Sequence, residues 1–412
     1  MRVLVLDGHV NPAVVSVRAL SKKGYRVSVG AAHPWSKAAC SRFSDARFVY
    51  PSTKLDLKGF VDCIAEQVKR EPGTFVLPLT EPTALAVSAC RGPILAAGGR
   101  IVMPPHNVML RACDKNETTA LAAAAGISTP QTCMIRSSNE ALHVANAIEY
   151  PVVLKARASQ ELNGHNRVSP TCRPRYGRNR EEFLAAFADV SQSSCSVLVQ
   201  EFIPGDGVLT SLLLSKGQLM SEFSYKRIRS VHPTGFGAAL RESVPTTRQL
   251  HEAALAVVRA LDTNWDGIAN VEFRVRPDGT PVFLEVNPRN VHSLALAVYA
   301  GVNFPAMLAE MAAQGDTNPA FGYSEGIQCR WLYGDFCRLL YIYGGAATNY
   351  PGPIPGRMKA LFDFLAPVPG AFHDNFSLDD PFPEFAEWIG AAFRFSFSKF
   401  RGSPRSSSGL NT

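Results

Sequence analysis

The sequence VFLEVNPRN, residues 282–290, carries a carboxylate, an amide and a guanidinium at every second position: Glu285, Asn287 and Arg289. It overlaps a longer stretch, NVEFRVRPDGTPVFLEVN (residues 270–287), in which two alternating runs are joined by an Asp-Gly dipeptide. Alternation of apolar and polar residues predicts strands, and Asp-Gly favours a two-residue type I′ loop. The sequence therefore predicts a β-hairpin with one polar face.

The predicted hairpin brings carboxylates together. A two-residue loop places Glu272 opposite Glu285, and Asn270 opposite Asn287. Like charges directly across a ladder are destabilising. A solvated strand face is one interpretation; the other is a metal–phosphate site, because Mg²⁺ prefers oxygen ligands from one or two carboxylates, phosphates and water. Arg289 would then meet phosphate charge. On this basis Glu285→Gln should relieve repulsion and slightly stabilise the protein without metal.

The composition is that of a globular protein with a small basic excess. Of the 412 residues 46% are hydrophobic and 19% are charged, and the formal net charge is +7. The length suits two or three domains. The excess of cations suits anionic substrates, and with no recognition motif we expect no nucleic-acid partner. The chain begins on a strand pattern, so we expect no signal peptide, and no apolar run reaches membrane-spanning length.

The nine cysteines are scattered, and none forms a CxxC pair. An odd, dispersed set argues for reduced thiols and against a zinc site or a disulfide framework. We therefore expect a cytoplasmic protein.

Short β-rich runs alternate with helical patterns over roughly the first 110 residues. RVLVL, YRVSVG, FVLPL and RIVMP read as strands, with helical stretches between the first two and between the last two. This alternation predicts a small parallel sheet. The first turn, LDGHVNP, lacks GxGxxG, so an NAD-dependent oxidoreductase is a weak alternative.

Three later segments combine charge with strand patterns. Lys155 in EYPVVLKARAS lies among apolar residues, so it either needs an anionic partner or extends from the strand end into solvent. Loop 157–180 holds six arginines against Glu161; this suits a cover over polyphosphate or a solvated loop. The strand in SVLVQEFIPGDG ends at Glu201 and enters an irregular segment whose backbone groups can recognise a nucleobase edge.

These segments, in this order, resemble the ATP-grasp superfamily from about Cys113 to Ala312. The motifs that carry the resemblance are DKNET, YPVVLKA, VQEFIPGD, KRIRSVHPTGFGAALRES, GIANVEFRV, FLEVNPR and AGVNFP. The resemblance implies an α/β and α+β fold. Its expected parts are a Rossmann-like N-terminal domain (1–112), a two-lobed ATP-grasp domain (113–316, lobes about 113–200 and 201–316) and a C-terminal extension (317–412) with a basic, disordered tail.

The resemblance also implies roles for individual residues. The ATP phosphates would be contacted by Lys115 and Lys155, adenine by the backbone around Glu201, Phe202 and Ile203, and the ribose by Asp206. One or two Mg²⁺, or Mn²⁺ as a substitute, would be bound by Glu272, Glu285 and Asn287. The implied catalytic residues are Arg289, for the phosphoryl group, and Lys226 and Arg241, which lie around PTGFG (233–237) and would contact the carboxylate substrate. PTGFG as an ordinary β-turn is the alternative.

Enzymes of this superfamily transfer the γ-phosphoryl group of ATP to a carboxylate and let an amine, less often a thiol, displace phosphate. The resemblance therefore implies a carboxylate–amine ligase that forms a C–N bond between small molecules, releases ADP and phosphate, and forms a homodimer. A non-catalytic ATP-binding module is the alternative. It is favoured by His292, where glycine is usual, and by a lid loop that has only Gly164 and Gly177.

The C-terminal residues combine aromatic side chains with cations. Tyr350 to Pro369 is rich in Pro and Gly and is expected to be irregular. FPEFAEWIGAAFRFSFSKFRGSPR (382–405) predicts a helix that is followed by a tail without acids. One face of that helix would hold Phe385, Trp388, Ile389, Ala392 and Phe393. This face either packs on the ATP-grasp body or makes a weak peripheral membrane contact.

Overall fold

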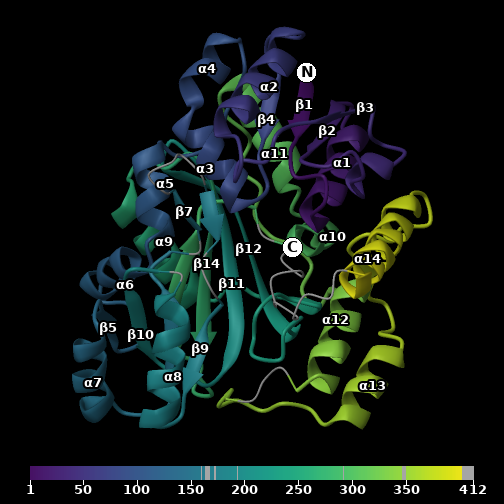
Figure 1. Cartoon of the computed structure of the whole chain (residues 1–412). Helices are drawn as coiled ribbons and strands as arrows, with labels where there is room; N and C mark the ends of the chain where they lie inside the picture. Colours follow the sequence, from purple (N-terminus) through teal and green to yellow (C-terminus); the bar gives the residue numbers. More distant parts are fainter. Residues whose placement is uncertain are drawn as a thin grey trace.

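The computed structural model describes residues 1–158, 160–162, 168–170, 173–192, 194–290, 292–345 and 349–400, without the side chains of 160–162, 168–170 and 394–400. Arg167, Gly164 and the tail predicted to be disordered lie outside the described residues. A small sheet near the N-terminus lies above a large central sheet, a second small sheet lies on one flank, and three C-terminal helices lie on the other (Figure 1).

The N-terminal sheet is parallel, as predicted, with strand order β3-β2-β1-β4. Its strands are β1 (Arg2–Val5), β2 (Arg26–Ala31), β3 (Ala46–Val49) and β4 (Phe75–Leu77). Its helices are α1 (Asn11–Lys22), α2 (Leu57–Lys69), α3 (Glu81–Ala89), α4 (Arg91–Ala96) and α5 (His106–Cys113), with a 3₁₀ turn η1 (Ala38–Cys40). Val3, Leu4 and Val5 are fully buried, as expected for a strand covered on both faces. RIVMP contributes only an isolated bridge at Arg100 instead of the predicted strand.

The second small sheet has the order β5-β10-β6-β9. Its strands are β5 (Thr132–Ile135), β6 (Val152–Ala156), β9 (Arg175–Gly177) and β10 (Val197–Glu201), and β7 (Gln160–Leu162) pairs separately with β8 (Val168–Pro170). The helices of this part are α6 (Lys115–Ala124), α7 (Ser138–Ala147) and α8 (Arg180–Ser191). Asp114 directly precedes α6, and its carboxylate caps the helix by accepting from the N–H groups of Asn116 and Glu117.

The large sheet has the order β15-β14-β11-β12-β13-β16-β17. Its strands are β11 (Asp206–Ser215), β12 (Gln218–Arg229), β13 (Leu240–Val244), β14 (Gly267–Val275), β15 (Pro281–Asn287), β16 (Gln328–Arg330) and β17 (Phe372–His373). Its helices are α9 (Arg248–Leu261), α10 (Leu294–Ala300) and α11 (Phe304–Gln314). Because β16 and β17 come from the C-terminal residues, the extension completes one edge of this sheet. The boundaries 1–112, 113–316 and 317–412 stay a prediction.

The C-terminal extension is more ordered than predicted. It contains α12 (Leu332–Tyr343), α13 (Arg357–Leu365) and α14 (Phe382–Phe400). Helix α13 falls inside the segment 350–369 that was expected to be irregular, and its Ala360 and Phe364 face the protein. Apolar residues at i and i+4 form one helical face, and that packing stabilises the helix between the flanking prolines.

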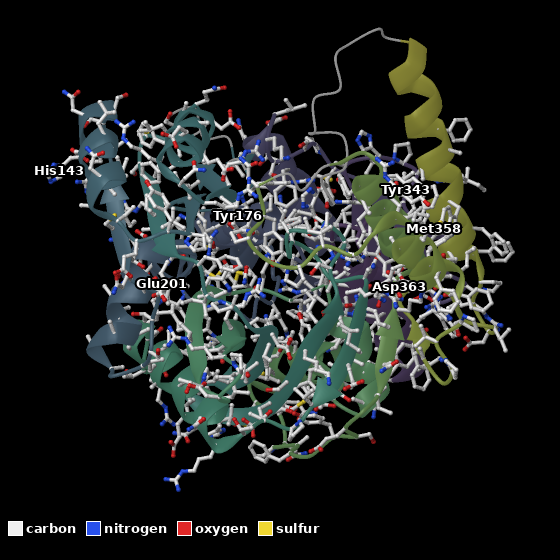
Figure 2. All side chains as sticks on the ribbon, turned by 90° about the horizontal axis from the view of Figure 1, so that it is seen from below. His143, Tyr176, Glu201, Tyr343, Met358 and Asp363 are labelled. Carbon is white, nitrogen blue, oxygen red and sulfur yellow. The ribbon has the colours of Figure 1, made fainter. Side chains whose placement is uncertain are left out.

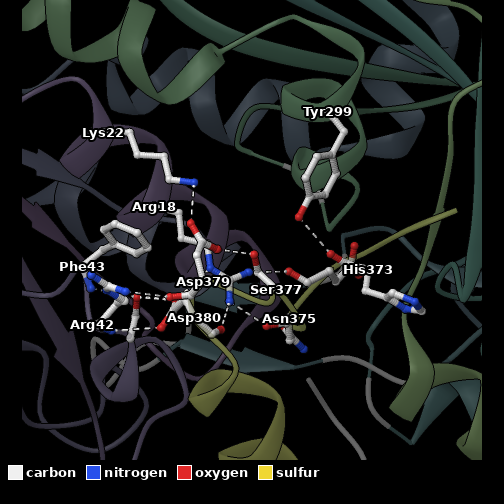
Figure 3. Close-up of polar contacts among 12 residues, drawn as sticks. Arg18, Lys22, Arg42, Phe43, Tyr299, His373, Asn375, Ser377, Asp379 and Asp380 are labelled. Carbon is white, nitrogen blue, oxygen red and sulfur yellow. Dashed lines mark hydrogen bonds and ion pairs between the residues drawn. The ribbon is translucent and has the colours of Figure 1, made fainter. Parts of the chain in front are cut away.

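A polar network joins the extension to the N-terminal sheet (Figure 3). Arg18 Nε on α1 donates to Asp380 Oδ2 at 2.8 Å, and both side chains are buried. The backbone N–H of Arg42 donates to Asp380 Oδ1 at 3.0 Å, and Lys22 pairs with Asp379 at 3.0 Å. These contacts fix the segment that leads into α14.

In the part of the chain that the structure describes, no single helix is long and apolar enough to cross a membrane. Helices α10 and α11 together have the length and composition of a membrane span, but they are bent by 90° relative to each other. Most residues of both helices are buried in the protein interior.

Candidate active site

The predicted hairpin is present as β14 and β15. Asn270 pairs with Asn287 and Glu272 with Glu285, as expected. The two carboxylates therefore project from neighbouring strands on the same face of the sheet.

The hairpin loop differs from the prediction. β14 ends at Val275 and β15 begins at Pro281, so the loop is longer than Asp278-Gly279 alone. The register shifts between Glu272 and Phe273, which leaves one extra residue on β15. This β-bulge compensates for the longer loop. The predicted pairing of Glu272 with Glu285 is therefore correct although the predicted turn type is wrong.

Both facing carboxylates have a cation as partner. Lys115 Nζ, in the first turn of α6, lies 3.3 Å from Glu285 Oε2, and Arg227 Nη2 lies 2.8 Å from Glu272 Oε1. Burial by itself raises the pKa of Glu285, but the charges of Lys115 and Lys155 outweigh it and hold that pKa at about 2. The repulsion expected between the glutamates is thus offset by cations of the protein.

A chain of hydrogen bonds orders the end of β15. Asn287 Nδ2 donates to Glu285 Oε1 at 3.2 Å, and Arg289 Nη2 donates to Asn287 Oδ1 at 3.3 Å. Arg289 Nε also lies 3.8 Å from Glu81 Oε2, in the first turn of α3. The buried Asn270 amide donates to the Arg289 carbonyl. Arg289 is therefore held at the edge between the hairpin and the N-terminal sheet.

Lys155 on β6 is half-buried, and its ammonium group is held by a buried side chain. Its Nζ donates at 3.0 Å to Oε1 of Gln200, a residue that is 1% exposed. Burial lowers the pKa of Lys155, the charge of Glu285 raises it in part, and the result is about 8. This placement differs from a lysine that extends into solvent, and it puts the ammonium within the field of the Glu285 carboxylate.

The segment after β10 connects the second small sheet to the large one. The N–H groups of Glu201 and Phe202 donate to the carbonyls of Gln131 and Pro151 at 2.9 and 3.1 Å. Ile203 is buried, and Asp206 begins β11 with its side chain exposed. The residues predicted to bind adenine and ribose thus follow one another in the segment 201–206, which we call the hinge.

An aromatic cluster covers this hinge. The Phe202 ring lies 6.2 Å from that of Tyr176 and 5.8 Å from that of Tyr350, centroid to centroid. Tyr176 donates from its hydroxyl to the Thr234 carbonyl at 2.8 Å. Figure 2 shows Tyr176 near the centre of the view and Glu201 to its left, with Tyr343 and Met358 on the right. Tyr350 belongs to the extension, which therefore reaches the hinge.

Two family profiles match the segments that carry this geometry. The profile described as "ATP-grasp in the biosynthetic pathway with Ter operon" matches residues 195–334, and the "ATP-grasp domain" profile matches residues 109–166. The first contains the hinge and the hairpin, and the second contains Lys115 and Lys155. The chain belongs to the ATP-grasp superfamily.

Full-length relatives of this ATP-grasp chain are distant. The large chain of carbamoyl phosphate synthase from Deinococcus radiodurans is 26% identical over 73% of this chain, which spans 29% of that protein. The D-alanine–D-alanine ligase of Nitrosomonas europaea is 26% identical over 48% of this chain, which spans 66% of the ligase.

Solved structures agree with the fold. An L-amino acid ligase from Bacillus licheniformis matches with a TM-score of 0.58 and 17% identity, over 76% of this chain and 74% of the ligase. Biotin carboxylase from Campylobacter jejuni matches with a TM-score of 0.62 and 16% identity, over 79% and 74% of the two chains. At these identities the likeness concerns the fold.

Two predicted catalytic cations of this ATP-grasp chain do not lie on the face that carries Glu272 and Glu285. Lys226 pairs with Glu242 at 2.7 Å, on the face of β12 opposite to Arg227, because successive side chains of a strand alternate. Arg241 is fully buried in an ion pair with Asp374. The burial of Arg241 contradicts its predicted contact with a carboxylate substrate, and the predicted contact of Lys226 stays a prediction.

Three residues near the site were not assigned from the sequence. Arg227 lies on the same face as Glu272, a position that the alternation of β12 would have indicated had its register been known. Glu81 follows the carboxyl end of β4, where ligands of parallel sheets commonly bind, and burial raises its pKa. For Tyr350 the sequence offers no signal, because only the fold brings it to Phe202.

The departures from the family pattern have local explanations. Desolvation and the charge of Arg289 lower the pKa of His292 to about 3, so its imidazole is neutral at pH 7. The PTGFG segment contains a turn in which Gly235 N–H donates to the His232 carbonyl at 3.0 Å. Most described arginines of loop 157–180 bind side chains of the protein: Arg157 with Asp114, Arg175 with Asp189, Arg178 with Glu182 and Arg180 with Asn146. The first hydrogen bond favours the interpretation of PTGFG as an ordinary β-turn. The pairing of the arginines favours the interpretation of loop 157–180 as a solvated loop over that of a cover for polyphosphate.

The half-buried ammonium of Lys155 gives a prediction for nucleotide affinity. Lys155→Met keeps the apolar stem and removes the charge, so ATP binding should weaken by about 1.5–3 kcal/mol, the value of a charge-assisted hydrogen bond. Since the pKa of Lys155 in the free protein is about 8, the ATP affinity of the wild type should also fall as pH rises through that value, and the variant should lose this dependence. Isothermal titration calorimetry between pH 7 and 9 measures both effects.

Lys359→Met is the matched control, because Lys359 lies on α13 with a side chain that is 68% exposed. It should leave the affinity and its pH profile unchanged. Equal ATP affinity of Lys155→Met and the wild type would return Lys155 to a purely structural role.

Proposed function

We propose that this chain is an Mg·ATP-dependent carboxylate–amine ligase that releases ADP and phosphate. One observation carries the proposal: Glu272, Glu285 and Asn287 converge on one face of the hairpin, and Lys115 and Lys155 come to the same face from α6 and β6. Hard oxygen ligands beside two half-buried ammonium groups match a metal–polyphosphate complex.

The donor set fits magnesium. Two carboxylates and an amide oxygen are hard ligands. Among the described residues, no group of three or more His, Cys, Asp or Glu side chains is placed to hold a metal. The remaining coordination positions would go to phosphate oxygens and water, as is usual for Mg²⁺. Glu272, Glu285 and Asn287 would hold the ion, which neutralises charge on the phosphates; Mn²⁺ takes the same ligands.

The side chains of the chain would position both substrates. Lys115 and Lys155 bind phosphate oxygens and align them for in-line transfer. The substrate carboxylate attacks the γ-phosphorus, the bond to the β–γ bridging oxygen breaks, and ADP leaves. The amine then attacks the acyl carbon, phosphate departs, and the nitrogen releases a proton. Arg289 stabilises charge on the transferred phosphoryl group.

The identity of the spent nucleotide tests the reaction class. Phosphoryl transfer to a carboxylate leaves ADP, whereas adenylation would leave AMP. Incubation with ATP, Mg²⁺ and a library of carboxylates and amines, followed by ion-exchange chromatography, should give ADP and phosphate in equal amounts. AMP as the main product would contradict the proposed class.

The alternatives give different outcomes in the same assay. A non-catalytic ATP-binding module would bind ATP but release no ADP with any substrate pair, and a carboxylate–thiol ligase would respond only to thiols. Matched relatives are named D-alanine–D-alanine ligase and L-amino acid ligase, which supports amino-acid-like substrates in the first screen. A cytoplasmic location and a homodimer stay predictions.

A further inference from the structure

Among the side chains of α14 that the structure describes, the acids lie on the inside and the phenylalanines on the outside. Glu384 and Glu387 are 6% and 7% exposed. Four apolar residues at helical spacing form what we call the outer α14 face, with exposed fractions of 63%, 57%, 44% and 62% for Phe382, Phe385, Ile389 and Phe393. A surface helix of a soluble protein normally shows the reverse pattern. Side chains project outward from α14 in Figure 2.

The inner face of α14 is fixed by specific contacts. Glu387 pairs with Lys37 at 2.7 Å and accepts from Trp331 Nε1 at 2.9 Å. Glu384 accepts from Trp388 Nε1 at 2.7 Å. Trp388 therefore points toward the protein. The prediction that placed Trp388 on the same helical face as Phe385 is wrong. Because the buried acids lose these partners if the helix rotates, α14 cannot turn its phenylalanines into the protein.

The residues after the outer α14 face are cationic. From Trp388 to Thr412 the sequence contains Arg394, Lys399, Arg401 and Arg405 and no acid. Phenylalanines beside cations match the boundary between acyl chains and anionic headgroups. A second copy of the chain fits less well, because a two-fold interface would bring the same cations of both copies together.

We propose that the outer α14 face docks on an anionic membrane surface. Helix α13 of the same extension also exposes one apolar face, Met358, Phe362 and Leu365, with exposed fractions of 75%, 71% and 67%. Arg357 and Lys359 lie beside that face in the sequence. Both helices lie on the flank opposite to α7 and α8 (Figure 1). The docked protein would leave the hinge and the hairpin free to bind substrates.

Co-sedimentation with vesicles tests this proposal. The full chain should bind vesicles of phosphatidylcholine and phosphatidylglycerol at least about tenfold more tightly than vesicles of phosphatidylcholine alone, and 0.5 M salt should weaken this binding because salt screens exposed charges. The double variant Phe385→Glu, Phe393→Glu should bind anionic vesicles at least about tenfold less, since it places two acids in the apolar contact.

Leu378→Glu is the matched control, because Leu378 is 91% exposed on the same extension and lies outside α14. It should bind vesicles almost as the wild type does, and all three proteins should bind ATP equally. Absence of binding to anionic vesicles by the wild type overturns the proposal, and so does equal binding by the double variant. Light scattering that shows a dimer, abolished by the double variant, together with no vesicle binding, would assign the face to a second copy.

Discussion

Glu285→Gln is expected to lower ATP-dependent ADP release by roughly 10²–10³-fold or more, since a metal that neutralises phosphate charge contributes several kcal/mol to the transition state. The amide keeps the shape of the side chain but removes the charge nearest to Lys115. Steady-state assays at saturating Mg²⁺ measure the loss. Near-normal ADP release by the variant would contradict the assignment of Glu285 to the metal.

The same substitution should destabilise the protein without metal. The sequence alone suggested the opposite, because two facing glutamates repel. In the structure Glu285 pairs with Lys115, and its pKa is held at about 2. A carboxyl whose pKa is depressed by folding contributes stability above its ordinary pKa and loses it as pH falls towards the folded value. The variant should therefore be less stable by about 1–3 kcal/mol at pH 7, and the difference should shrink between about pH 4.5 and pH 2.

Glu252→Gln is the control for both effects. Glu252 forms an exposed i,i+4 pair with Arg248 on α9, with side chains 59% and 89% exposed. Such pairs contribute at most about 0.5 kcal/mol. ADP release and thermal stability should both stay close to those of the wild type.

The hairpin of β14 and β15 could be predicted because its information is local. Alternation with period two identifies the strands and the face that Glu272 and Glu285 share. The turn could not be predicted, because the bulge between Glu272 and Phe273 depends on how β14 and β15 pair as a whole. The sequence thus predicted the pairing of Glu272 with Glu285 better than the loop that joins their strands.

The roles of Lys226 and Arg241 could not be predicted, for two different reasons. Lys226 and Arg227 are neighbouring cations of the same strand, and sequence alone does not tell which of them faces Glu272. Arg241 has a partner, Asp374, that lies 133 residues away in the sequence. Contacts of such long range follow from the finished fold.

The attachment of the extension could not be predicted from the sequence either, because it also depends on long-range contacts. Arg18 and Asp380 are 362 residues apart, yet both are buried in one ion pair (Figure 3). Composition predicted an irregular segment at 350–369, where the structure has α13. Propensity is a weak guide wherever tertiary packing decides.

The strongest single contribution of the extension to stability is expected from Asp374. Its carboxylate is fully buried, pairs with Arg241 and accepts from Asn11 Nδ2 at 2.8 Å. Burial by itself would raise the pKa of Asp374, but the Arg241 charge holds it below its usual range. Asp374→Asn leaves the Arg241 guanidinium buried without its counter-charge, and breaking a buried pair in this way costs about 3–5 kcal/mol. Urea denaturation followed by tryptophan fluorescence measures the loss.

Two further variants distinguish the effect of breaking this ion pair from a general effect of removing an acid. Asp363→Asn breaks the exposed pair with Lys359 on α13 and should cost less than about 1 kcal/mol. The double variant Arg241→Met, Asp374→Asn removes both charges, so it should lose less stability than the two single variants together. Strict additivity, or a loss below about 1 kcal/mol for Asp374→Asn, would show that the pair is not what holds the extension to β13. Because Arg241 pairs with Asp374 and lies away from Glu272 and Glu285, an Asp374→Asn protein that remains folded should still bind ATP.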